Sequence, residues 1–234
     1  MVELSNRLKT IASLVKPGSR IADIGTDHGF LPIYLAQKGV ITHAVAMDVR
    51  KGPLARAREH VEEYALTEII ETRLSDGLEK LKSGEADTVI IAGMGGPLIL
   101  EILSRGMAVV PSVDRFILSP QSDWNGFRKS LRKMGFVQLG EDMVCEDGKY
   151  YLITEVRYAP EKIKTGEAQE LEDRFGPYLL KEKHPELHRY LRWQQGIYCG
   201  ILHKLAESDA KKAEERELEV KQELAFVDAA LRLF

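Results

Sequence analysis

The chain has 234 residues, of which 44% are apolar, so it can bury a full hydrophobic core and carry a second, smaller domain. Its net charge of −3 excludes nucleic-acid binding driven by overall positive charge, but not a local basic patch. Cys145 and Cys199 lie outside any C-x-x-C spacing, and no apolar run reaches the roughly 20 residues of a membrane span. We therefore expect a soluble, cytoplasmic protein without a metal centre or a membrane contact.

The first part of the chain alternates strand and helix patterns, after a helix predicted over residues 4–15. Strands are predicted over residues 21–24, 44–49, 69–74, 88–92 and 116–118, and helices over 31–37, 53–64, 98–104 and 124–134. Two further strands, 137–145 and 150–157, flank Glu146-Asp147-Gly148, which is typical of a hairpin. This order predicts a doubly wound, mostly parallel α/β sheet with an antiparallel terminal hairpin.

Beyond residue 160 the strand pattern disappears and charged residues dominate. Hydrophobic and neutral residues then recur in alternating four- and three-residue steps, which is typical of a heptad seam. They are Leu187, Leu191, Gln194, Tyr198, Ile201 and Leu205, and, after Glu207-Ser208-Asp209, Val220, Leu224, Val227 and Leu231. We expect residues 1–160 to form the α/β domain and residues 161–234 an antiparallel, coiled-coil-like helical domain.

Ligands of doubly wound sheets bind at the carboxyl ends of the strands, so the polar residues that follow each strand are candidate site residues. Strand by strand, these are Gly25, Asp27 and His28; Asp48; Asp76 and Gly77; and the flexible loop Gly93-Met94-Gly95-Gly96. The glycine turn after the first strand leads into a helix N-terminus, which allows a ligand to approach the backbone. Asp48 can accept both hydroxyls of a ribose, and Asp76 can accept from an adenine amine.

Each candidate also has a purely structural interpretation. Asp27 can cap the following helix, and His28 can form only local hydrogen bonds. Asp48 can form a surface ion pair with Arg50, and the glycine-containing segments can be ordinary turns or strand ends. Their shared position at one edge of one sheet favours a common ligand site.

The sequence of the glycine turn discriminates between ligands. A nicotinamide or flavin site uses G-x-G-x-x-G, but here Asp27 replaces the middle glycine and its carboxylate would repel a pyrophosphate. A Walker-type phosphate loop is excluded because the sequence contains no G-K-[ST]. A cationic nucleoside without phosphate fits better. S-adenosyl-L-methionine carries an amine and a sulfonium whose positive charges are compatible with nearby carboxylates. Its ribose hydroxyls can donate to Asp48, and its adenine amine can donate to Asp76.

Longer segments around these residues read LSNRL, ADIGTDHGFLP, AMDVRKGPLARARE, SDGL, VIIAGMGG, LSPQSD and EDGKYY. They resemble, over essentially the whole chain, the bacterial TrmK family of class I methyltransferases, which have a Rossmann-like fold and a C-terminal coiled-coil domain. The resemblance implies methyl transfer from S-adenosyl-L-methionine to N1 of adenine 22 in the D-arm of tRNA. We expect cofactor contacts from Asp23, Gly25, Asp27, Asp48, Val49, Asp76, Gly77, Gly93 and Gly95, and a monomeric protein.

Adenine N1 suits the residues around the fourth strand. Methylation of an exocyclic amine usually uses an Asn/Asp-Pro-Pro-aromatic loop at that place, whereas this chain has Gly93-Met94-Gly95-Gly96-Pro97, without a side-chain acceptor. N1 already owns an in-plane lone pair, so the main requirement is to stabilise the positive charge that develops on the base. We assign this role to Asp27, proton acceptance to His28, and the floor of the base pocket to Met94 and its neighbouring glycines.

Local basic clusters are the candidate tRNA contacts. They are Arg7, Arg50, Lys51, Arg56, Arg58, Arg128, Lys129, Arg132 and Lys133, with Arg189, Tyr190, Arg192 and Trp193 on the C-terminal helices. The cluster at residues 128–133 can equally be a solvated helix face. The C-terminal region is not a basic arm, because residues 167–234 hold 11 Lys and Arg against 14 Asp and Glu. We expect it to read tRNA shape or to pack against a partner.

Other functions remain open at this point. The acceptor can be another RNA, a protein or a small molecule, with the same cofactor. The chain can also be a non-catalytic module that binds the cofactor or RNA. A nicotinamide oxidoreductase is the least favoured alternative, because of the missing glycine.

Overall fold

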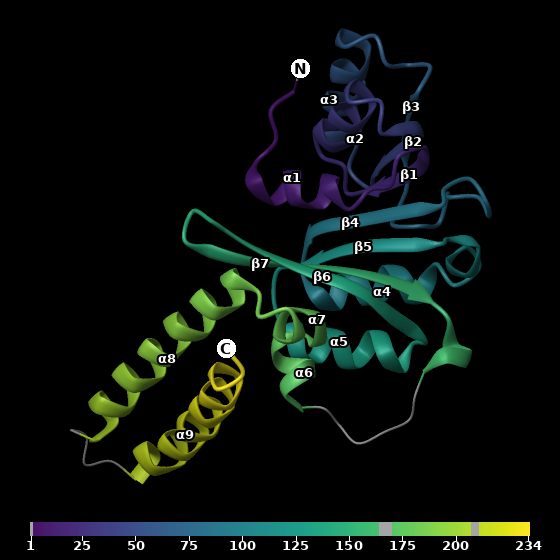
Figure 1. Cartoon of the computed structure of the whole chain (residues 1–234). Helices are drawn as coiled ribbons and strands as arrows, with labels where there is room; N and C mark the ends of the chain where they lie inside the picture. Colours follow the sequence, from purple (N-terminus) through teal and green to yellow (C-terminus); the bar gives the residue numbers. More distant parts are fainter. Residues whose placement is uncertain (1, 164–169, 207–210) are drawn as a thin grey trace. The chain divides into compact units, whose positions relative to one another are not determined.

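The computed structural model describes residues 2–163, 170–206 and 211–234, with the backbone alone for residues 211–214 (Figure 1). The chain divides into two compact units, Met1–Gly166 and Glu167–Phe234. The expected boundary between residues 160 and 161 lies close to this division and stays a prediction. The short helix η2 (Pro160–Lys162) packs on β6 (Phe136–Glu146) of the first unit, and the amide of Ala159, just before it, donates to the carbonyl of Gly135 at 2.9 Å.

The first unit alternates strands and helices as predicted. In chain order it contains α1 (Asn6–Ser13), β1 (Ser19–Ile24), α2 (Phe30–Gln37), β2 (Ile41–Asp48), α3 (Lys51–Glu63), β3 (Ile70–Leu74), β4 (Thr88–Met94), α4 (Gly96–Arg105), η1 (Val110–Ser112), β5 (Arg115–Pro120), α5 (Trp124–Lys133), β6 (Phe136–Glu146), β7 (Lys149–Tyr158) and η2. Side-chain caps start two of the helices: Ser5 accepts from the amide of Leu8, and Asp123 from that of Gly126.

The described residues form a seven-stranded sheet in the order β3-β2-β1-β4-β5-β7-β6 (Figure 1). Strands β1 to β5 pair in parallel, whereas β7 pairs antiparallel with both β5 and β6. This confirms the predicted doubly wound sheet with its terminal hairpin. The chain reverses its direction of travel across the sheet between β1 and β4, and in such sheets this switch point is where ligands bind.

Helices cover both faces of the sheet, because neighbouring residues of a strand point to opposite faces. On β4, Ile91 belongs to the same buried cluster as Ile99 of α4 and Phe127 of α5. The preceding residue, Ile90, belongs instead to a second cluster with Ile33 of α2. Buried on both faces, the central strands read as the continuous apolar runs seen in the sequence.

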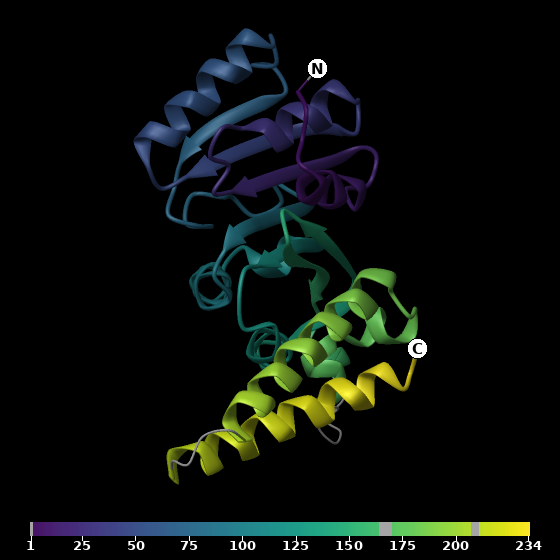
Figure 2. The same cartoon turned by 90° about the vertical axis from the view of Figure 1, so that its left-hand side faces the viewer.

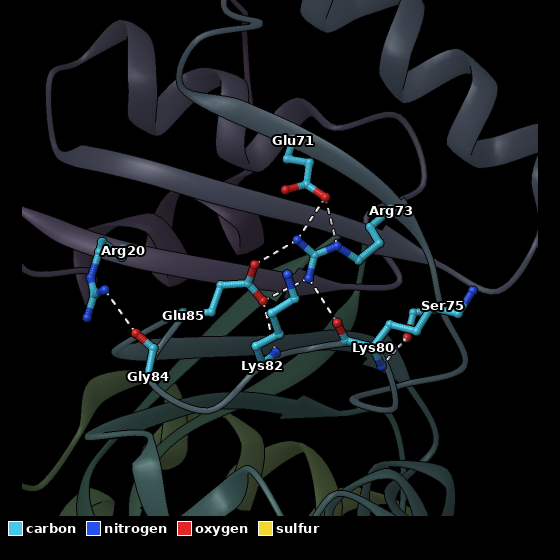
Figure 3. A network of polar contacts seen from close by, with 8 residues as sticks. All are labelled: Arg20, Glu71, Arg73, Ser75, Lys80, Lys82, Gly84 and Glu85. Atoms are coloured by element: carbon cyan, nitrogen blue, oxygen red, sulfur yellow. Dashed lines mark hydrogen bonds and ion pairs between the residues drawn. The ribbon is translucent and has the colours of Figure 1, made fainter.

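A polar network fastens the loop that follows β3 (Figure 3). Arg73 of β3 donates from Nη1 and Nη2 to the two carboxylate oxygens of Glu85, each at 2.7 Å, and from Nη1 to the carbonyl of Lys80 at 2.9 Å. The Ser75 hydroxyl accepts from the amide of Lys80 at 3.2 Å. Hydrogen bonding to Arg73 lowers the pKa of Glu85 to about 2, so this carboxylate stays ionised in mild acid.

The second unit is helical in the residues that are described. It contains α6 (Glu170–Phe175), α7 (Pro177–Lys181), α8 (Pro185–Ala206) and α9 (Lys211–Leu231). Helices α8 and α9 lie side by side in both views (Figures 1 and 2) and correspond to the predicted helical pair. Leu187, Leu191, Val220 and Val227 of the predicted seam are buried. The expected turn at Glu207-Ser208-Asp209 lies outside the described residues, and α6 and α7 are too short to be predicted from periodicity.

None of the described helices combines the length and the apolar character that a membrane crossing requires. Within the same residues, no group of three or more His, Cys, Asp or Glu side chains is arranged to hold a metal ion.

Candidate functional site

A cavity of about 470 Å³ lies at the carboxyl ends of β1 to β4. Its lining brings together most of the residues predicted from the strand ends. Those are Gly25, Asp27, Asp48, Val49, Asp76, Gly77, Gly93 and Met94, together with Arg7 and Arg50. The predicted residues Asp23, His28, Gly95, Lys51, Arg128, Lys129 and Arg132 are not in the lining.

The turn after β1 is built on residues with positive φ. Gly25 has φ +76°, which side chains rarely adopt, and a Cβ atom there would overlap the terminal methyl of Met94. The amides of Gly25 and Thr26 donate to the carbonyl of Met47 at 2.8 and 3.0 Å, which anchors the turn to β2. Gly29 is the N-cap residue of α2 and no side chain caps this helix, so the structure excludes the capping role for Asp27.

Asp27 lines the cavity, and its side chain is 55% exposed. The two carboxylate oxygens of Asp27 face different basic side chains. Oδ1 lies 3.6 Å from Nη2 of Arg56, and Oδ2 lies 3.7 Å from Nε2 of His28. These distances are longer than good hydrogen bonds, so Asp27 retains the capacity to accept from a ligand.

His28 is held beside the cavity by an aromatic stack. Its ring stacks on Phe30 with centroids 5.2 Å apart and on His60 with centroids 5.7 Å apart. The Nδ1 atom of His60 lies 2.9 Å from the carbonyl oxygen of His28, whereas the Nδ1 atom of His28 is buried without a hydrogen-bond partner. The stack links α3 to the glycine turn.

Asp48 is a buried carboxylate at the end of β2, with a side chain that is 3% exposed. Its Oδ1 atom accepts from the amide of Arg50 at 2.8 Å, while the Arg50 guanidinium is 68% exposed with its Nε atom 3.6 Å away. The alternative of an ordinary surface ion pair is therefore wrong, because one partner is buried in the cavity wall. A buried carboxylate with free acceptor capacity is suited to hydroxyl donors.

Asp23 lies within β1 and is buried. Burial raises the pKa of Asp23 to about 6, opposed by Thr26 and reinforced by the charge of Asp48. The expected direct contact of Asp23 with a cofactor is thus not supported by its position, because its carboxyl is enclosed by protein.

Asp76 follows β3 on the fastened loop and lines the cavity. Its Oδ2 atom accepts from Nη2 of Arg105 at 2.9 Å, and the same guanidinium also pairs with Glu79. The neighbouring Gly77 packs on α4, since a Cβ atom there would lie 2.9 Å from Cγ2 of Ile102. The loop therefore forms one firm end of the cavity.

The prediction of a flexible loop at Gly93-Met94-Gly95-Gly96 is wrong for its first two residues. Gly93 and Met94 belong to β4, where Met94 pairs with Pro120 of β5. Gly95 is the N-cap residue of α4, so the chain passes directly from strand to helix. Gln121, which follows β5 and lines the cavity, was missed; applying the strand-end rule to the fifth strand would have found it.

The basic residues fall into different environments. Arg128 is not a surface residue: its side chain is 5% exposed, and its Nε atom lies 2.7 Å from Oε1 of the fully buried Glu141. This corrects its assignment as a tRNA contact, because a paired guanidinium inside the protein cannot reach a phosphate. Lys51 and Arg132 are exposed, and Lys129 is half-buried.

The lining fits a cationic adenosine derivative. Asp48 offers a buried acceptor for ribose hydroxyls, Asp76 offers a further acceptor, and Gly25 presents backbone without a side chain to the cavity. The carboxylate of Asp27 disfavours a pyrophosphate at the turn. The donor set therefore agrees with S-adenosyl-L-methionine.

Comparisons with known proteins agree with this site. Residues 4–154 match a family model described as a methyltransferase domain. A tRNA (adenine(22)-N(1))-methyltransferase of Bacillus subtilis is 34% identical over 229 residues, 95% of each chain. The crystal structure of the B. subtilis m1A22 tRNA methyltransferase TrmK superposes with a TM-score of 0.83 at 29% identity, covering 99% of this chain and 100% of that one. M. capricolum TrmK in complex with S-adenosyl-homocysteine has a TM-score of 0.81 at 29% identity, covering 98% of each chain.

Proposed function

This chain belongs to the TrmK family of tRNA (adenine-22-N1)-methyltransferases, and we propose that it methylates N1 of adenine 22 in tRNA with S-adenosyl-L-methionine as the donor. The observation that carries the proposal is the cavity at the switch point of the sheet, which joins a buried ribose acceptor, Asp48, to an open carboxylate, Asp27. S-adenosyl-L-methionine, when bound, supplies an electrophilic methyl group on a sulfonium.

The strand order orients the cofactor. Going from the edge of the sheet inward, the cavity presents Asp76 after β3, Asp48 at the end of β2, Gly25 after β1 and Gly93 on β4. Neighbouring strands are about 4.8 Å apart, so these groups span roughly 14 Å. Asp76 accepts from the adenine amine, Asp48 holds the ribose hydroxyls, and the glycine turn faces the methionyl part.

Asp27 serves the target base. Adenine N1 attacks through its own lone pair, so no proton has to leave first, and positive charge develops on the ring. The Asp27 carboxylate stabilises this charge and accepts from the 6-amino group, while Arg56 and His28 hold it at the cavity mouth. His28, which lies outside the lining with its Nε2 atom 3.7 Å from Oδ2 of Asp27, takes up through Asp27 the proton that the 6-amino group of the methylated cation releases. The remaining contribution is the alignment of N1 behind the methyl group.

The end of β4 argues for N1 and against the exocyclic amine. Methylation of that amine requires hydrogen-bond acceptors that make its nitrogen more nucleophilic. Here the chain passes from Met94 through Gly95 directly into α4, so no side-chain acceptor stands at this place. Met94 lines the cavity there with an apolar thioether, which suits the floor under a flipped base.

The tRNA approaches over α3. Arg50, Lys51, Arg56 and Arg58 are exposed on this helix and at its start, next to the cavity mouth. We assign the phosphate contacts to them, with Lys129 and Arg132 as further candidates on α5. The helical unit reads tRNA shape rather than charge, because its composition is not basic. We also propose that the protein is a cytoplasmic monomer.

The deciding experiment is nucleoside analysis of unmodified tRNA incubated with the protein and S-adenosyl-L-methionine. We expect 1-methyladenosine in tRNA with adenine at position 22 and none in the same tRNA with guanine there. Tight binding of S-adenosyl-homocysteine without methyl transfer to any tRNA would favour a different acceptor or a non-catalytic module.

A further inference from the structure

Helix α3 packs closely against the glycine turn that carries Asp27. Gly29 allows this approach, because a Cβ atom built on it would lie 3.3 Å from the Cβ atom of Ala57 on α3. Three residues further along the helix, His60 is half-buried and reaches the backbone of the same turn. Neither Ala57 nor His60 belongs to the lining of the cavity, so both face the turn rather than the ligand site.

Asp27 holds a backbone conformation that its own residue type does not favour. The amide of Gly29 donates to the carbonyl of Thr26 at 3.0 Å, so Asp27 and His28 are the two central residues of a tight turn. Asp27 has φ +51°, in the left-handed region where glycine is the usual residue. Such a conformation persists only where neighbouring groups fix the backbone.

His60 supplies a contact that fixes this turn. Its Nδ1 atom lies 2.9 Å from the carbonyl oxygen of His28, the residue that follows Asp27. A carbonyl oxygen can only accept a hydrogen bond, so Nδ1 of His60 carries a proton and donates it. The rings of His60 and Phe30 stack with centroids 4.9 Å apart, which orients the imidazole towards the turn. The donor and the stack together hold the backbone directly after Asp27.

The side of the turn that faces the cofactor is held separately. The amides of Gly25 and Thr26 donate to the carbonyl of Met47 on β2, whereas the contacts from α3 fall on the last two residues of the turn. Asp27 lies between these two anchors. A change at α3 therefore alters the direction of the Asp27 carboxylate more than the backbone at Gly25.

We propose that His60 is a positioning residue for methyl transfer, because its hydrogen bond to the carbonyl of His28 holds the Asp27 carboxylate towards the adenine. The inference rests on the proposed function. His60 acts through Asp27 and not on the base or the cofactor. A displacement of the carboxylate by about 1 Å is enough to lower the rate, since stabilisation of the developing charge depends on alignment.

Three substitutions separate the hydrogen bond of His60 from the packing of its ring. His60→Phe keeps a stacking ring without the donor and should lower the single-turnover methylation rate about 5- to 50-fold. His60→Asn places an amide nitrogen at the position of Nδ1 and should restore the rate to within about threefold of the unmodified protein. His60→Gln carries its donor one bond further out and should not restore it. The affinity of all three for S-adenosyl-homocysteine, measured by calorimetry, should change less than about threefold.

A double substitution tests whether His60 acts through Asp27. In the Asp27→Asn background, His60→Phe should lower the remaining rate by less than about twofold, because no carboxylate is left to position. A purely structural role would instead lower the rate by the same factor in both backgrounds. His43→Phe, at another half-buried histidine on β2, is the matched control and should leave the rate unchanged.

The positioning role would be overturned by equal losses in the two backgrounds, by a full rate in His60→Phe, or by a correctly folded His60→Asn that recovers nothing. Thermal melting of each variant identifies any loss that comes from unfolding. Failure of the unmodified protein to form 1-methyladenosine in any tRNA would refute the proposed function itself. The hydrogen bond has a readout without activity: nitrogen NMR of histidine-labelled protein should show a proton on Nδ1 of His60. A ring protonated at Nε2 alone would overturn the proposal even in an active enzyme.

Discussion

Arg56 on α3 places its Nη2 atom 3.6 Å from the Oδ1 atom of Asp27 at the mouth of the cavity. Both side chains are about half exposed, 49% and 55%, so this pair is well solvated and stabilises the fold little. Its significance is positional: α3 keeps a cation next to the carboxylate that faces the incoming base.

Asp27→Asn should reduce kcat by about 10²- to 10³-fold, because the neutral amide no longer stabilises positive charge on adenine. The affinity for S-adenosyl-homocysteine should change less than about threefold. Single-turnover methylation and calorimetry measure the two quantities. Asp147→Asn is the matched control, since Asp147 also has positive φ, +50° against +51°, but lies in the hairpin turn. Near-normal turnover in Asp27→Asn would remove Asp27 from the mechanism.

Asp48→Asn should weaken binding of S-adenosyl-homocysteine by about 10- to 100-fold, the usual loss when a charged acceptor becomes neutral. The asparagine oxygen can still accept from the amide of Arg50, so the local fold is preserved. Calorimetry measures the affinity, and Glu59→Gln, at an exposed position of α3, is the control. Unchanged affinity would show that the ribose is held elsewhere.

The pKa of Asp23 predicts a pH-dependent stability. Its folded-state pKa is raised from 3.8 to about 6, so its protonated form favours the native state. That contribution is complete below about pH 4 and is lost as pH rises through about 6. Asp23→Asn should remove it and raise the free energy of unfolding at neutral pH by up to about 3 kcal/mol. Urea unfolding across this pH range measures the effect, with the exposed Asp114→Asn as the control. An identical pH profile for Asp23→Asn and the unmodified protein would contradict it.

The sequence determined the order of strands and helices well, because the buried central strands and amphipathic helices each carry a clear periodicity. The predicted end of β4 was wrong. Gly93 and Met94 lie in a glycine-rich segment that is typical of a loop, and their place in the strand depends on the pairing of Met94 with Pro120 of β5. The sequence also placed Arg128 on the surface, because the position of Glu141 on a hairpin strand is a long-range fact that helical spacing cannot reveal.

Arg128→Ala should destabilise the protein by about 3–5 kcal/mol, because it leaves the Glu141 carboxylate buried without this partner. Binding of tRNA, measured below the melting temperature, should be unaffected. Lys133→Ala, at an exposed position of the same helix, should change stability by less than about 0.5 kcal/mol. Weaker tRNA binding without a change in thermal stability in Arg128→Ala would restore its assignment to the RNA.

The helical unit should contribute to tRNA binding but not to cofactor binding. Removal of residues 167–234 should leave the affinity for S-adenosyl-homocysteine intact and weaken that for tRNA. In the full chain, Trp193→Ala should weaken tRNA binding by about 5- to 100-fold if its ring, 51% exposed, stacks on a base. Leu218→Ala is the control, as its side chain is similarly exposed at 60%. Equal tRNA affinity of the truncated and complete proteins would defeat this role.

Two carboxyl groups near the cavity, Glu85 and Asp23, differ in the pH at which they take up a proton, because Glu85 is paired with Arg73 and Asp23 is buried. Glu85 keeps its charge down to about pH 2, whereas the carboxyl of Asp23 at the centre of the sheet takes up a proton near pH 6. Mild acidification therefore neutralises a buried carboxyl of β1, whereas the loop that carries Asp76 keeps its ionised anchor.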